Sequence, residues 1–109
     1  MFSATFIFEK KQLDERFHWL DEEIAIFARQ TTGYAGEEAW ENPQNGRICT
    51  VYYWTEMTGL HELMQHPKHL EAKAAQGAWL NGYQVVISQV VRAYNDNTLE
   101  HPLKDWKVD

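Results

Sequence analysis

The chain has 109 residues, of which 16 are acidic and 10 are basic, so its formal net charge is −6. This length suits one domain, and a composition of 44% hydrophobic and 14% aromatic residues can bury a core, which excludes general disorder. The acidic balance and the lack of a basic run argue against a nucleic-acid partner. The single cysteine, Cys49, excludes an intrachain disulfide and any metal site built on paired cysteines, and it fits a reducing, cytoplasmic setting.

Neither a membrane segment nor a secretory signal is expected. No apolar stretch approaches the roughly 18–20 residues that a spanning helix needs. The first residues lack the basic start of a signal peptide, and their apolar run ends at Glu9.

Hydrophobic spacing predicts the first two elements. Residues 2–8 place Phe2, Ala4, Phe6 and Phe8 on one side, which is the alternation of a strand. Five apolar residues then recur at helical spacing and predict an amphipathic helix that ends near Thr32-Gly33: Leu13, Phe17, Leu20, Ile24 and Phe27.

Two more strands are predicted around the turn-forming sequence of residues 42–46. The strand over residues 34–41 is the weaker, and the strand over residues 47–54 is the stronger. Alternate residues of the stronger strand share a face, which gives two sets: Cys49, Val51 and Tyr53, and Ile48, Thr50, Tyr52 and Trp54. The pattern does not decide which set meets the helices.

The second helical region is expected in two pieces. Leu60, Leu63 and Met64 have helical spacing, and His66-Pro67 interrupts it because the residue before proline avoids helical angles. The second piece is predicted from about Pro67 to Leu80 and is ended by Asn81-Gly82. A fourth strand follows over residues 83–94. The polar tail, residues 95–109, is either a frayed end or an arm that packs on another subunit.

The element order is β-α-β-β-α-β, which predicts an α+β, ferredoxin-like domain over residues 1–94, with helices on one face of an antiparallel sheet. The third and fourth strands are apolar on both faces, so the second sheet face is also expected to be buried. A second copy of the chain could cover it by sheet-on-sheet packing, which predicts a twofold homodimer.

Several stretches resemble the antibiotic biosynthesis monooxygenase (ABM) superfamily. They are residues 51–54, Leu60, residues 66–73 and residues 82–87, together with Gly33-Tyr34-Ala35-Gly36 and Trp40. The likeness covers about residues 2–94. It implies a dimeric α/β barrel with a pocket between the helices and the sheet of each subunit. Members include cofactor-free oxygenases that act on polycyclic aromatic ketones and phenols, and haem-binding proteins that degrade haem.

The haem-degrading branch fits this sequence less well. That branch uses an Asn on the first strand and a Trp and a His on the second helical region. Here the first strand has no Asn, and those later positions fall near Leu63 and Lys73. We therefore expect no cofactor, with haem disfavoured and a shifted ligand such as His69 left open.

His69 is the candidate general base, because an ordinary histidine pKa near 6.5 suits proton abstraction from a phenol or an activated methylene. Trp54, Tyr53 and Trp79 are candidate walls for a flat apolar ligand, and His66 is a further substrate-binding candidate. Each has a plainer alternative, since aromatics favour cores and a histidine at a helix start commonly caps the backbone. A metal site on His61, His66 and His69 is not expected, because no recognised ligand spacing accompanies them.

The resemblance implies a cofactor-independent monooxygenase that oxidises a small aromatic or quinol-type substrate with dioxygen, and this is the function we expect. The alternatives are a non-catalytic dimeric module that binds a small ligand or haem, and a dimer without a pocket. A deep pocket with His69 facing inward would favour the enzyme, and a wholly apolar pocket would favour the binding module.

Overall fold

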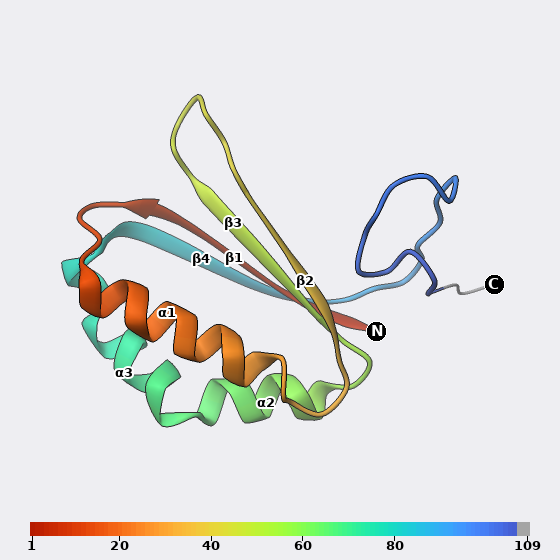
Figure 1. Cartoon of the computed structure of the whole chain (residues 1–109), viewed down its shortest axis with the longest axis horizontal. Helices are drawn as coiled ribbons and strands as arrows, with labels where there is room; N and C mark the ends of the chain where they lie inside the picture. Colours follow the sequence, from red (N-terminus) through yellow and green to blue (C-terminus); the bar gives the residue numbers. More distant parts are fainter. Residues whose placement is uncertain (107–109) are drawn as a thin grey trace.

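The computed structural model describes residues 1–106 (Figure 1). Residues 107–109, the end of the predicted tail, lie outside the described residues. The elements in chain order are β1 (Phe2–Lys10), α1 (Glu15–Ala28), β2 (Tyr34–Glu41), β3 (Ile48–Trp54), α2 (Met57–Gln65), α3 (Pro67–Ala75), the short 3₁₀ turn η1 (Gln76–Ala78) and β4 (Leu80–Gln89).

The strands form one antiparallel sheet in the order β2-β3-β1-β4. In its centre Phe6 of β1 lies between Thr50 of β3 and Val85 of β4. All three helices lie on the same side of the sheet (Figure 1). This confirms the α+β, ferredoxin-like arrangement that the element order predicts.

A local signal explains where the first helix begins, whereas the helix ends at Ala28, before the predicted Thr32-Gly33. Asp14 caps α1, because its carboxylate accepts a hydrogen bond of 2.8 Å from the backbone N–H of Phe17. The chain turns after α1 at Gly33, whose φ of +77° suits glycine. The Gly33 carbonyl accepts from the N–H of Thr55 at 2.7 Å, which ties this turn to the end of β3.

The second helical region breaks at His66-Pro67 as predicted, but its predicted end is wrong. The helix stops at Ala75, and Leu80 already belongs to β4. The reason is tertiary: β1 extends to Lys10, which pairs with Leu80, and the Trp79 carbonyl accepts from the N–H of Lys11 at 2.8 Å. Asn81-Gly82 therefore lies inside a strand, beside the register shift at Glu9/Lys10, rather than ending a helix.

The fourth strand also ends earlier than predicted, at Gln89 instead of residue 94. Its neighbour β1 begins at Phe2, and the last bond between the two segments runs from the N–H of Val90 to the Met1 carbonyl at 2.9 Å. Beyond that point β4 has no described strand beside it, so the apolar pattern of residues 90–94 forms no ladder.

The space between helices and sheet holds two separate core clusters. One contains Phe8, Leu20, Trp79 and Leu80, and the other contains Ala28, Trp54, Leu60 and Leu63. Trp54 is fully buried, and its indole N–H donates to the Thr31 hydroxyl at 2.8 Å. Trp54 and Trp79 therefore belong to different core clusters, one at each end of the space between the helices and the sheet.

The tail folds back on the sheet face that the helices leave uncovered, which we call the outer face. Pro102 lies against Gly36, and Leu103 is buried. His101 Nε2 lies 2.9 Å from a carboxylate oxygen of Glu38, and the His101 ring packs edge-on against Tyr53. Part of the outer face is thus covered by the chain itself.

Candidate functional site

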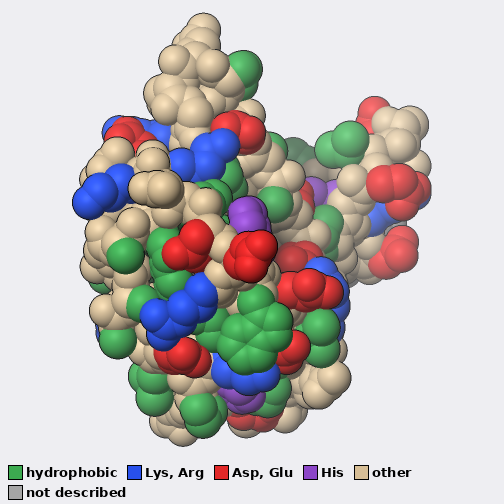
Figure 2. Space-filling view, turned by 60° about the vertical axis from the view of Figure 1, so that its left-hand side comes forward, with side chains coloured by type: hydrophobic (Ala, Val, Ile, Leu, Met, Phe, Trp, Pro, Cys, Tyr) green, Lys and Arg blue, Asp and Glu red, His purple; other side chains and the backbone are tan. Residues whose placement is uncertain are grey.

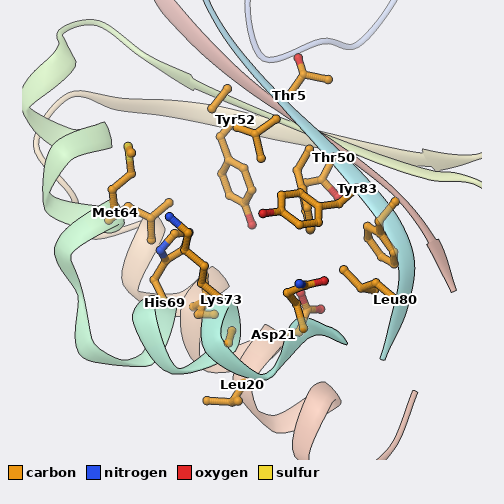
Figure 3. Close-up of a pocket in the computed structure, with 18 of the residues that line it drawn as sticks. Thr5, Leu20, Asp21, Thr50, Tyr52, Met64, His69, Lys73, Leu80 and Tyr83 are labelled. Atoms are coloured by element: carbon orange, nitrogen blue, oxygen red, sulfur yellow. The ribbon is translucent and has the colours of Figure 1, made fainter. Parts of the chain in front are cut away.

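A cavity of about 430 Å³ lies between the helical layer and the sheet. Members of both core clusters line it, among them Leu20, Leu63, Trp54 and Trp79. Its walls are mostly apolar and aromatic, with a few polar groups (Figure 3), which is the usual character of a small-molecule site.

The edge strand β4 supplies an open wall of this cavity. Tyr83, Val85 and Ile87 line the cavity, yet they remain 46%, 48% and 43% exposed. Side chains that are both lining and exposed mark where a cavity meets solvent. The sheet edge at β4 is therefore one place where a ligand can enter.

His69 is held in the cavity wall by the geometry of α3. Pro67 occupies the first turn of this helix, and His66 Nδ1 accepts from the N–H of Lys68 at 3.1 Å, which caps the helix start. The helical repeat then turns His69, Ala72, Lys73 and Gln76 toward the cavity. His69 and Lys73 rise together from α3, with Tyr52 on the sheet side (Figure 3).

The His69 imidazole has the properties of a base. Its Nδ1 atom is buried and has no hydrogen-bond partner within residues 1–106. Burial lowers the pKa of His69, the charges of Lys73 and His66 lower it further, and the Met64 carbonyl opposes these effects. The ring is therefore neutral near pH 7 and can accept a proton.

Other polar groups also face the cavity. Tyr52 and Tyr83 bring hydroxyls from β3 and β4, and Thr50 lies near them (Figure 3). Burial raises the pKa of Tyr52, so this phenol stays protonated and can donate a hydrogen bond to a ligand. Asp21 reaches the cavity from α1; its side chain is exposed, and partial desolvation by the surrounding protein raises the pKa of its carboxyl group.

Comparison with solved structures identifies the fold. The cofactor-independent oxygenase SnoaB from Streptomyces nogalater is 12% identical, with a TM-score of 0.67 over 84% of this chain and 94% of that chain. Rv0793 from Mycobacterium tuberculosis is 14% identical, with a TM-score of 0.65 over 86% and 98% of the two chains. A third structure, an antibiotic biosynthesis monooxygenase, is 14% identical, with a TM-score of 0.63 over 84% and 99%.

The chain has the ABM fold. At these identities the likeness shows the fold and leaves the reaction open. No family model matches the sequence, and no curated protein matches it either.

The ABM fold brings three of the five predicted site residues to one cavity. His69, Trp54 and Trp79 all line it. Both tryptophans are also core residues, with exposures of 0% for Trp54 and 3% for Trp79. They can form walls of the cavity, but they also hold its ends in place.

The other two predicted residues lie elsewhere, and their placement in the pocket is corrected. Tyr53 points to the outer face, where its hydroxyl donates to Glu38 at 3.0 Å. The alternation of β3 sends its neighbours Tyr52 and Trp54 to the helices instead. His66 caps α3 and lies against the Phe27 ring, with 4.0 Å between ring centroids, and it does not line the cavity.

Several lining residues were not predicted as site residues: Asp21, Thr50, Tyr52, Lys73 and Tyr83. For Lys73 the sequence did hold a signal, because it follows His69 by one helical turn and must share its face. For Tyr52 the signal was its alternation with Trp54. The sequence held no signal for Asp21, because this residue lies beside the apolar stripe of α1 rather than on it.

Two remaining features of the sequence have no part in the cavity. Cys49 lies in the middle of β3, and burial raises the pKa of its thiol, which keeps it protonated. Within residues 1–106, no three His, Cys, Asp or Glu side chains converge as a metal site. No helix of that same part of the chain is long and apolar enough to cross a membrane.

Proposed function

We propose that the chain is a cofactor-independent monooxygenase that oxidises a small aromatic or quinol-type substrate with dioxygen. The observation that carries this proposal is His69, a partly buried histidine with a lowered pKa and a buried Nδ1 atom that has no hydrogen-bond partner within residues 1–106, in the wall of a mostly apolar cavity. The shared fold with SnoaB supports it, because that protein is a cofactor-independent oxygenase.

The chemistry needs only a base, a dry cavity and an electron-rich substrate. His69 takes a proton from a phenol or an activated methylene, and the resulting anion can itself reduce dioxygen. For a methylene, one oxygen atom ends as the new carbonyl oxygen and the other leaves as water. The Tyr52 and Tyr83 hydroxyls can hold the developing oxyanion by hydrogen bonds.

The proposed working form is a homodimer in which the outer faces of two sheets pack together. Trp40 of β2 and Val86 of β4 remain 53% and 44% exposed on that face, which the helices do not cover. The tail is proposed to contribute to this contact, because it already lies on the same face.

Oxygen uptake with a panel of reduced polycyclic phenols and anthrone-like compounds tests the activity, with chelator present and no flavin or nicotinamide added. The wild type is expected to consume oxygen, and His69→Ala is expected to lose at least about a hundredfold in rate, the usual range for a general base. His61→Ala serves as the matched control, since His61 is an exposed histidine of α2 that does not line the cavity.

Equal rates for wild type and His69→Ala would overturn the role of His69. No uptake by any variant would instead favour a non-catalytic module. Haem and naphthol titrations of the wild type would then show which ligand the module binds.

A further inference from the structure

Lys73 is an unusual cation in this acidic chain, because it lines the cavity and has no acidic partner within residues 1–106. The chain has 10 Lys and Arg residues, and only Lys107 lies beyond residue 106. Six of the others form ion pairs with Asp or Glu side chains. Within the described residues three remain unpaired, Lys11, Lys73 and Arg92, and of these only Lys73 lines the cavity.

Elsewhere on the surface, charged side chains of opposite sign lie close together, unlike Lys73 in the cavity wall. Acidic and basic side chains lie next to one another across the face seen in Figure 2. Asp21 is the single acidic side chain among the residues that line the cavity, and it reaches the cavity from α1, without an ion pair to Lys73. A lysine left unpaired at a mostly apolar cavity is available to an anionic group of a ligand.

The position of Lys73 on α3 places this cation close to His69, the proposed base. Lys73 follows His69 by four residues on α3, which places their Cβ atoms roughly 5–6 Å apart on one helix face. Figure 3 shows both side chains on the same side of the cavity. A group held by Lys73 would therefore lie on the same side of the cavity as the atom that His69 deprotonates.

We propose that the cavity selects aromatic compounds that carry an anionic group, such as a ring carboxylate, and that Lys73 pairs with that group. The inference rests on the proposed function, since it assigns the substrate class of the same site. Lys73 is here a specificity-determining residue. Its charge offsets the repulsion that a chain of net charge −6 exerts on an anionic ligand, and it fixes which end of the ring system enters first.

A matched pair of probes tests this inference: 2-naphthoate and the neutral 2-naphthamide, which have nearly the same shape. We expect calorimetric titration of the wild type at low salt to give about three- to tenfold tighter binding of the carboxylate. Lys73→Gln should abolish that preference. Lys11→Gln, which removes another unpaired charge away from the cavity, should retain it. Both lysines are exposed, so neither change threatens the fold.

Equal affinity of the wild type for the two probes, or a preference that survives in Lys73→Gln, would overturn the inference. Binding of neither probe would overturn it too. The oxygen-uptake test with uncharged phenols measures the proposed activity independently of Lys73. A positive result there, together with no carboxylate preference, would support the enzyme and contradict the role of Lys73.

Discussion

Histidines of the same chain have three different roles, and only their surroundings separate them. His66 caps a helix, His101 pairs with Glu38 on the outer face, and His69 lines the cavity. His66 and His69 are three residues apart, a spacing that would bring them to one face of a continuous helix. Pro67 removes His66 from the helix, so only His69 is turned inward.

The first residue-scale prediction concerns pH. Because burial and nearby positive charges lower the His69 pKa, the neutral base persists to more acidic pH than a free histidine. We expect kcat/KM for an uncharged phenol to be constant near neutrality and to fall on the acid side with an apparent pKa below the ordinary 6.5. A pH profile of initial oxygen-uptake rates measures this.

Lys73→Gln gives the internal control for that profile. Removing the positive charge should raise the His69 pKa, and the acid limb should move to higher pH. An acid limb at or above 6.5 in the wild type would contradict the assignment of His69 as a base with a lowered pKa.

At the scale of elements, the close contact between α2 and the end of β3 positions Trp54. Gly59 lies on α2 over the Trp54 indole, and a Cβ at Gly59 would collide with that ring and with the Thr32 carbonyl. Gly59 is fully buried there without a positive φ. The glycine is needed for space rather than for its backbone freedom.

Gly59→Ala is therefore expected to destabilise the fold by about 2 kcal/mol or more, since the added methyl group must displace a buried ring or the backbone. Urea unfolding followed by tryptophan fluorescence measures the change. Gly77→Ala is the matched control, because nothing lies within 4 Å of a Cβ at that position. We expect it to change stability by less than about 1 kcal/mol. Equal effects of the two substitutions would contradict this account.

On the scale of the whole molecule, the two faces of the sheet are covered differently. The helices and the cavity occupy one face, while the tail covers only part of the other. Exposed apolar residues remain beside the tail, with Trp40 and Val86 at 53% and 44% exposure. An apolar sheet face of this kind is commonly completed by a second sheet.

We therefore expect the protein to sediment as a dimer. Val86→Glu should shift it toward monomer, because a buried, unpaired carboxylate at a sheet-on-sheet contact is costly. Ile26→Glu is the control, since Ile26 is similarly exposed at 42% but lies on α1, on the helical side. Analytical ultracentrifugation over a range of concentrations distinguishes the two states. A wild type that stays monomeric, or equal loss of dimer in both variants, would contradict the proposed interface.

The sequence alone determined the order and type of the elements, because hydrophobic spacing, proline and turn residues act locally. It also suggested His69, Trp54 and Trp79 as candidate site residues, and the fold brings these three to one cavity. Tertiary structure decided the rest. Pairing with β1 set both ends of β4, although Asn81-Gly82 looked like a helix end, since ladder bonds with a distant strand outweigh a local turn signal. Alternation left the faces of β3 undecided, and only the packing of Trp54 on α2 sent Tyr52 inward and Tyr53 outward. Packing, which no local pattern contains, lowered the pKa of His69, the base that the sequence had suggested, and placed Lys73 in the same cavity wall.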